Sequence, residues 1–211
     1  MESKGSNHIN RLMDFLDRIS RQVYAEKPSE LHSYITTKSV DTFLETCPLR
    51  PGARILDVGC GQGPALEYFS RKGFFPVGVT LSDEDVEACR KQGFTVARMD
   101  QSFLEFEAET FDLVWARHVA EHSIFPLFTL DGFQRVIRGG GYLYLEVPAP
   151  DTSCHHEQNP NHYSVLTKSS WESLLQRAGF EIVLELSYKF DVIAGPDEYW
   201  AFCCRKQRRE S

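Results

Sequence analysis

The segment from Ile55 to Gly63 constrains the fold more than any other part of the chain. It contains a short apolar run, three glycines at alternate positions (Gly59, Gly61 and Gly63) and the start of a helix at Pro64. Glycine permits a tight turn and a close approach of the backbone to a ligand. The N-terminus of the following helix offers free N–H groups and a partial positive charge. The segment therefore predicts a strand, a ligand-binding loop and a helix.

Short apolar runs alternate with helical stretches from Arg54 onward. The expected strands are 55–58, 76–79, 95–99, 111–116, 142–147, 180–187 and 198–204, and the expected helices are 64–71, 83–92, 126–137 and 169–178. Ser169 and Glu172 have the spacing of a capping box, which would open the last helix. The alternation predicts an α/β fold with a Rossmann-like, doubly wound and mostly parallel sheet. Because the last two runs follow each other directly, one antiparallel strand is expected near the C-terminus.

Two helical stretches precede this pattern. Apolar residues recur at helical spacing over 9–25 and again over 31–44, with Pro28 between the two stretches. We expect residues 1–50 to form an N-terminal helical cap on a Rossmann-like domain that covers residues 51–211.

Composition excludes several classes of protein. Hydrophobic residues make up 42% of the 211 residues, which is enough for a folded core. The net charge of −7 disfavours a nucleic-acid partner. No apolar run approaches the ~20 residues needed to span a bilayer. The six cysteines form no CxxC pair, and the N-terminus has no apolar signal core, so a cytoplasmic protein is expected. The oligomeric state stays open.

Several motifs together resemble class I S-adenosylmethionine-dependent methyltransferases of the small-molecule type. Asp57 and the three glycines resemble the first motif of that family, and Phe111–Val114 with Glu121-His122 resembles the fourth strand and the pair that follows it. The stretch 135–143 and the run 178–180 resemble the entries to the fifth and sixth strands. The resemblance covers residues 54–187 in family order. It implies S-adenosylmethionine as the cofactor.

The resemblance also implies which residues hold the cofactor. Asp57 would hold its amino group and Asp100 would face its adenine. The full set is Tyr34, Asp57, Gly59, Cys60, Gly61, Gly63, Thr80, Leu81, Ser82, Met99, Asp100, Gln101, Ser102, Arg117 and His118. The family usually has an acidic residue at the end of the second strand, and this chain has none there. Thr80, Ser82 or Asp83 would replace it, unless Ser82 only caps the next helix.

The long polar loop over 151–163 is expected to meet the acceptor. We predict His162, and next His118, as the general base, because histidine titrates near neutral pH. His122, His155, His156 and Tyr163 are expected to bind the acceptor. No metal is expected. The alternative is a metal site formed by residues of this loop, namely Asp151, His155, His156, Glu157 and His162.

Methyl transfer to the oxygen or carbon of a small or medium-sized acceptor, such as a sugar or another metabolite, is therefore the expected function. Two alternatives stay open. One is a catalytically inactive module that binds S-adenosylmethionine or S-adenosylhomocysteine. The other is an NAD-binding oxidoreductase, although the dinucleotide fingerprint favours glycine or alanine where this chain has Pro64.

Overall fold

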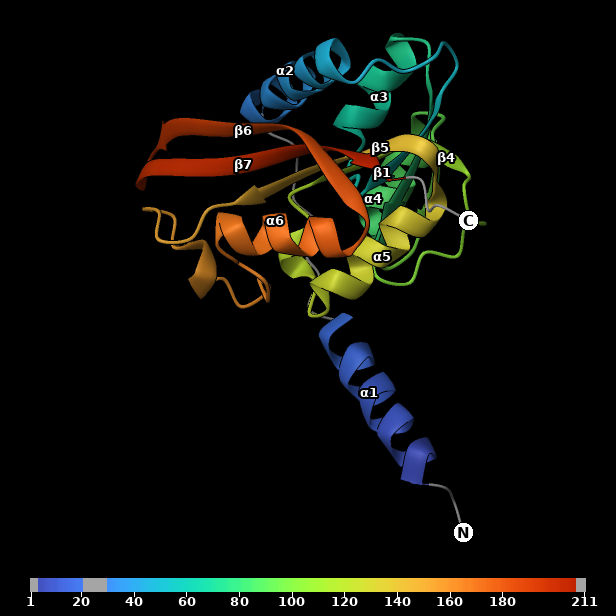
Figure 1. Cartoon of the computed structure of the whole chain (residues 1–211), viewed down its shortest axis with the longest axis vertical. Helices are drawn as coiled ribbons and strands as arrows, with labels where there is room; N and C mark the ends of the chain where they lie inside the picture. The colour runs from blue at the N-terminus through green and yellow to red at the C-terminus, as the bar shows by residue number, and fades with distance from the viewer. Residues whose placement is uncertain (1–3, 21–29, 208–211) are drawn as a thin grey trace.

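The computed structural model describes residues 4–20 and 30–207, which form a seven-stranded sheet with helices on both faces (Figure 1). The strands are β1 (Arg54–Val58), β2 (Phe75–Thr80), β3 (Thr95–Arg98), β4 (Phe111–Arg117), β5 (Ile137–Pro148), β6 (Phe180–Val192) and β7 (Gly195–Lys206). Their order in the sheet is β3-β2-β1-β4-β5-β7-β6. Among the described strands, β7 alone runs opposite to the others, since it pairs antiparallel with both β5 and β6. The predicted fold class is confirmed.

The strand order reverses between β1 and β4. From β1 the chain builds outward to β2 and β3, and it then returns to place β4 on the other side of β1. Loops that leave two such strands diverge and leave a crevice beyond their carboxyl ends, which is where ligands bind in sheets of this type. The glycine loop lies at this point because it directly follows β1.

The helices divide between the two faces of the sheet. They are α1 (Lys4–Ser20), α2 (Glu30–Thr46), α3 (Pro64–Arg71), α4 (Asp83–Lys91), α5 (Pro126–Val136) and α6 (Lys168–Arg177), with two 3-10 turns, η1 (Ala120–His122) and η2 (His156–Gln158). α2 and α3 cover one face, and α5 and α6 cover the other (Figure 1). α4 packs beside α3 through the buried side chains of Leu66, Val86 and Cys89.

The second helix is part of the main core. Phe43 of α2 is fully buried, and its ring makes edge-to-face contacts with Trp115, Tyr142 and Tyr144 at centroid distances of 5.9–6.1 Å. α1 instead points away from the sheet, and several of its apolar side chains are exposed (Figure 1). Of the two cap helices, α2 therefore packs into the core of the domain, whereas α1 leaves apolar side chains exposed. The domain boundary at residue 50 stays a prediction. Residues 21–25 of the first expected helix lie outside the described residues.

Two local expectations were wrong. The last helix is not opened by a Ser169–Glu172 capping box, because Thr167 is its N-cap and accepts a hydrogen bond from the Ser170 N–H at 3.3 Å. The fifth strand begins at Ile137 rather than at residue 142. Its glycine-rich start forms a bulge against β4, and a Cβ on Gly141 would lie 2.8 Å from the Asp112 carbonyl oxygen. Gly141 therefore permits a close approach of the backbone within the strand.

Among the described residues, no helix is long and apolar enough to cross a membrane.

Replacement of Phe43 by alanine tests whether α2 is integral to the domain. Removing a fully buried aromatic ring should lower the free energy of unfolding by about 3–5 kcal/mol. Chemical denaturation measures this change, and Glu45→Ala, at an exposed position of the same helix, is the matched control. If Phe43→Ala and Glu45→Ala unfold at the same denaturant concentration, α2 does not contribute to the core of the domain.

Candidate active site

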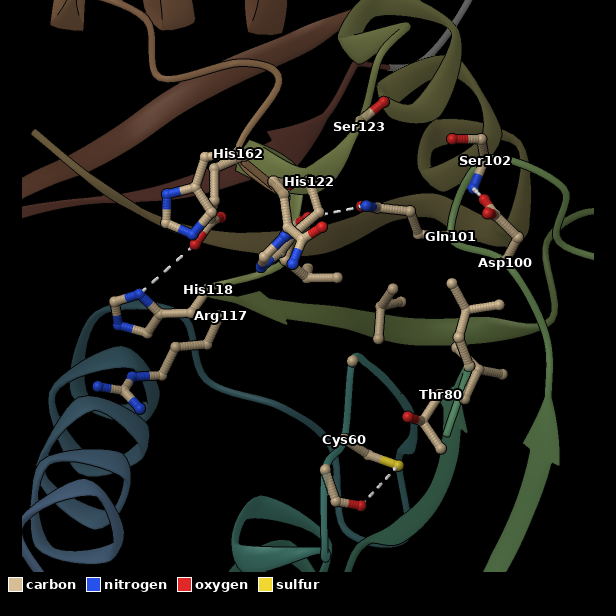
Figure 2. Close-up of a pocket in the computed structure, with 18 of the residues that line it drawn as sticks. Cys60, Thr80, Asp100, Gln101, Ser102, Arg117, His118, His122, Ser123 and His162 are labelled. Atoms are coloured by element: carbon tan, nitrogen blue, oxygen red, sulfur yellow. Dashed lines mark hydrogen bonds and ion pairs between the residues drawn. The ribbon is translucent and has the colours of Figure 1, made fainter. Parts of the chain in front are cut away.

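A cavity of about 520 Å³ opens beyond the carboxyl ends of β1, β2 and β4. Figure 2 shows His118, His122 and His162 on one side of it, Cys60 and Thr80 at its base, and Asp100 and Ser102 opposite the histidines. Most of the predicted site residues line this cavity: Gly59, Cys60, Gly61, Thr80, Leu81, Met99, Asp100, Gln101, Ser102, Arg117, His118, His122, His156, His162 and Tyr163. Five do not: Tyr34, Asp57, Gly63, Ser82 and His155.

The glycine loop turns directly out of β1 into the cavity. The backbone N–H groups of Gly59 and Cys60 both donate to the carbonyl oxygen of Val79 on β2, at 2.9 and 3.1 Å. Gly59 has a φ of 71°, and a Cβ there would lie 2.8 Å from Cγ2 of Val119. A side chain at Gly59 would therefore require both a strained backbone and displacement of the loop after β4, which explains the glycine.

Asp57 lies on β1 directly beneath this loop. Its side chain is only 3% exposed, and Oδ2 has no hydrogen-bond partner among the described residues. Burial raises the pKa of Asp57 to about 7, although the charge of Arg117 partly offsets the effect. A buried carboxyl group without a partner is costly to ionise unless a cation approaches it. Asp57 is therefore suited to a positively charged ligand group.

The segment after β2 holds the three candidates for the missing acidic residue in different surroundings. Ser82 caps α4 by accepting from the Asp85 N–H at 3.2 Å, and Asp83 is 79% exposed and paired with Arg98 at 3.4 Å. The acidic residue of this segment that lines the cavity is Asp85, which the sequence pattern did not predict, and Thr80 lines the cavity as well. It is 4% exposed, and its Oδ1 has no hydrogen-bond partner in the described part of the chain. Burial raises its pKa.

Residues after β3 form the wall opposite the histidines. Oδ1 of Asp100 accepts a hydrogen bond from the Ser102 N–H at 2.7 Å, and the hydroxyl of Ser102 lies 2.7 Å from that of Thr129 on α5. The side-chain amide of Gln101 donates to the Val119 carbonyl oxygen at 2.7 Å. These contacts tie the loop after β3 to the loop after β4 and to α5, so the two walls of the cavity are fixed relative to each other.

A buried ion network fixes the end of β4. Oε1 of Glu146, a fully buried residue on β5, lies 2.7 Å from Nε of Arg117 and 2.9 Å from Nε2 of His118. Although burial alone would raise it, contact with His118 and Arg117 lowers the pKa of Glu146 to about 2. Burial lowers the pKa of His118, but hydrogen bonds to Glu121 and Glu146 outweigh that effect and raise it. The raised pKa favours the protonated form of His118, which makes this residue less suited than a neutral histidine to accept a proton.

The polar loop over residues 151–163, called the histidine loop below, is fastened to η1 by hydrogen bonds. The N–H groups of Tyr163 and Ser164 both donate to the carbonyl oxygen of Glu121, at 2.8 and 2.9 Å. The Ser164 hydroxyl also donates to the carbonyl oxygen of Ser123 at 2.6 Å. These bonds bring His162 beside His122, with ring centroids 4.7 Å apart.

Burial, with further contributions from His122 and His156, lowers the pKa of His162. A neutral imidazole results at neutral pH, which can accept a proton. His156 instead contacts both carboxylate oxygens of Asp197 at 3.1 Å. His155 is exposed, and it lies 3.6 Å from Glu157, which is also exposed. The metal site considered for residues of this loop alone is therefore not assembled in the structure.

Comparisons with known proteins give the family. A family model described as a methyltransferase domain matches residues 26–185. The 27-O-demethylrifamycin SV methyltransferase of Amycolatopsis mediterranei is 27% identical over 164 residues, which are 69% of this chain and 60% of that protein. A ubiquinone biosynthesis O-methyltransferase of Hahella chejuensis is 30% identical over 110 residues, which are 49% of this chain and 46% of that protein. The chain thus spans about half to six tenths of these relatives.

Solved structures confirm the fold. An S-adenosylmethionine-dependent methyltransferase from Archaeoglobus fulgidus matches with a TM-score of 0.66 and 18% identity, covering 82% of this chain and 94% of that one. The [4+2]-cyclase SpnF matches with a TM-score of 0.68 and 20% identity, covering 87% of this chain and 86% of that one. S-adenosylmethionine is the methyl donor of the methyltransferase family.

Proposed function

The chain belongs to the methyltransferase-domain family, and on that premise we propose that it transfers a methyl group from S-adenosylmethionine to a hydroxyl oxygen of a small, largely apolar acceptor. The observation that carries this proposal is the cavity itself. It joins the glycine loop, Asp85 and Asp100 to a neutral histidine on the loop after β5. Family membership argues against the alternative of an NAD-binding oxidoreductase.

The apolar character of the acceptor is supported by the cavity wall. Phe103, Phe125 and Tyr163 line the cavity and are 44%, 40% and 39% exposed, so large ring surfaces face solvent. Exposed apolar side chains at a cavity favour an apolar ligand over a sugar. Relatives are named as methyltransferases of 27-O-demethylrifamycin SV, of ubiquinone biosynthesis and of fatty acids, the last two as O-methyltransferases.

The residues present fit the proposed donor. The glycine loop lines the cavity at Gly59, Cys60 and Gly61, so its backbone can contact the amino-acid end of the donor. Oδ2 of Asp57, buried without a partner among the described residues, is suited to the cationic amino group of the donor. Asp100, on the opposite wall, keeps its proposed place beside the adenine ring.

Asp85 supplies the acidic group that β2 lacks. It projects from the first turn of α4 into the cavity, and its unpartnered oxygen can accept hydrogen bonds from the two ribose hydroxyls. Thr80 is a weaker candidate, because its hydroxyl already accepts from the Ser82 N–H at 3.3 Å. We therefore propose that the ribose contact has moved from the strand end to the helix.

Methyl transfer requires alignment, exclusion of water and removal of the acceptor proton. The bound donor supplies a methyl group already activated by its sulfonium. His162 is the residue on which loss of the hydroxyl proton depends, since it is neutral and faces the cavity. The O–CH3 bond forms as the S–CH3 bond breaks, and the sulfur keeps the electron pair as a neutral thioether.

The pH dependence of cofactor binding tests Asp57. Its pKa of about 7 means that it is protonated below neutral pH, whereas a cationic amino group is bound by the carboxylate. Affinity for S-adenosylhomocysteine should therefore rise with pH between 5 and 7, by up to about tenfold per unit. Calorimetry measures this, and Asp57→Asn should bind weakly without that slope. If the affinity of Asp57→Asn rose with pH as steeply as that of the wild type, Asp57 would not be a residue that binds the cofactor.

Asp85→Ala tests the ribose contact. Losing hydrogen bonds to a charged acceptor should weaken S-adenosylhomocysteine binding by about tenfold or more. The matched control is Asp83→Ala, two residues earlier on α4, where the carboxylate faces Arg98 and solvent. Its dissociation constant should stay within about twofold of wild type. If Asp83→Ala weakened S-adenosylhomocysteine binding more than Asp85→Ala, Asp83 rather than Asp85 would be the residue that binds the ribose.

His162→Gln tests turnover separately from binding. The variant should lose at least about 100-fold in kcat, because proton removal contributes that much or more, while its affinity for S-adenosylhomocysteine stays within about twofold. Gln158→Ala, at an exposed position of the same loop, is the control. The assay uses a panel of phenolic and aliphatic alcohols with radiolabelled donor. A wild-type protein that binds the cofactor but methylates none of them would favour the inactive binding module.

A further inference from the structure

Three potential metal ligands from two separate segments meet at the wall of the cavity. Glu121 and His122 belong to η1, and His162 belongs to the histidine loop forty residues later. One carboxylate oxygen and one nitrogen of each ring lie within 4.8 Å of one another. Ligands about 2.1 Å from a common cation lie up to about 4 Å apart. A small inward rotation of the three side chains is therefore enough to complete a site.

Both imidazoles are held in the orientation that metal ligands need. Nδ1 of His122 lies 2.9 Å from the Asn161 carbonyl oxygen, and Nδ1 of His162 lies 3.0 Å from the His156 carbonyl oxygen. A carbonyl oxygen only accepts, so each Nδ1 carries the proton and donates it. This hydrogen bond leaves Nε2 of each ring as the nitrogen available to a metal ion. Metal-binding histidines are usually oriented by this kind of hydrogen bond.

Glu121 supplies the negative charge. Its side chain is 2% exposed, and Oε1 lies 3.8 Å from Nδ1 of His118. Oε2 is buried and has no hydrogen-bond partner among residues 4–20 and 30–207. A buried carboxylate oxygen without a partner is costly, and a bound cation would remove that cost.

We propose that Glu121, His122 and His162 bind one divalent transition-metal cation, with its open coordination positions facing the cavity. Two imidazoles and one carboxylate suit Zn²⁺, Fe²⁺, Co²⁺ or Mn²⁺ better than Mg²⁺ or Ca²⁺, which prefer oxygen ligands. This site differs from the one considered for residues 151–162 alone, because two of its three ligands come from η1.

The role of the cation rests on the proposed function. A hydroxyl group bound to a divalent cation loses its proton to water more readily, because the cation stabilises the oxyanion. The oxyanion then forms the O–CH3 bond. His162 remains essential, but as a ligand of the cation rather than as the direct proton acceptor. Kinetics of His162 variants alone do not distinguish these two roles, whereas metal binding does.

A second cluster nearby, formed by Cys154, His156 and Asp197, is the competing location. There Nε2 of His156 already contacts both oxygens of Asp197 at 3.1 Å, so two of the three ligands satisfy each other. Its ligands therefore lack the free lone pair and the unpartnered oxygen that Glu121 and His162 offer.

Cobalt titration of the chelator-treated full chain tests the proposal. Visible absorption of Co²⁺ reports its coordination, and calorimetry gives its stoichiometry and affinity. We expect one Co²⁺ per chain in the wild-type protein. Glu121→Gln, His122→Ala and His162→Ala should each weaken binding by more than about tenfold. His155→Ala and Cys154→Ser are the matched controls, and they should bind Co²⁺ as the wild type does.

Three outcomes overturn the site: no stoichiometric Co²⁺ binding by the wild type, unchanged affinity in His162→Ala, or loss of binding in Cys154→Ser alone. If Glu121→Gln does not fold, His162→Ala decides, because its side chain lies on a loop. Calorimetry with S-adenosylhomocysteine on the same proteins separates the two proposals. A wild-type protein that binds the cofactor but not Co²⁺ rejects the metal site alone, whereas failure of the wild type to bind the cofactor rejects the proposed function.

Discussion

The carboxylate of Glu146 is the group on which the arrangement of the active site depends. It is fully buried on β5, so it needs charged partners, and it finds them in Arg117 and His118 at the end of β4. Its other oxygen accepts from the hydroxyls of Tyr144 and Ser39, which brings in α2. Because an unpaired charge at this depth costs several kcal/mol, the ends of β4 and β5 are held together. Because η1 is the next element after β4, these contacts also set the direction in which the chain enters η1.

The sequence predicted those parts of the fold that depend on local patterns of residues. Strand and helix alternation, the glycine loop and the final antiparallel strand all depend on residues close in sequence. Asp85 was missed because it lies three residues beyond the cap residue Ser82, and only the first turn of α4 brings it back over the end of β2. Glu146 was missed because a charged residue within an apolar strand pattern carries no sign of its partners, which lie some thirty residues earlier.

The site is likewise only partly local. His162 was predicted from the composition of its loop, and Glu121 and His122 were predicted as a motif. Their meeting depends on two backbone hydrogen bonds to the Glu121 carbonyl oxygen, and no side-chain pattern reports backbone contacts of that kind. His162 and His118 were the first and second candidates for the general base. Their surroundings separate them, since the pKa of His118 is raised by hydrogen bonds to two carboxylates that outweigh its burial, and that of His162 is lowered by burial.

The double anchor of the histidine loop has an evolutionary consequence. Both hydrogen bonds at Glu121 are made by main-chain N–H groups of residues 163 and 164, so any non-proline residues can make them. Apart from His162, the positions between the end of β5 and that anchor can then diverge without loosening the loop from η1. Descendants of such a chain could exchange one acceptor for another by changing this loop, while the donor half of the cavity stays untouched. Selectivity and donor binding are thus inherited as separable traits.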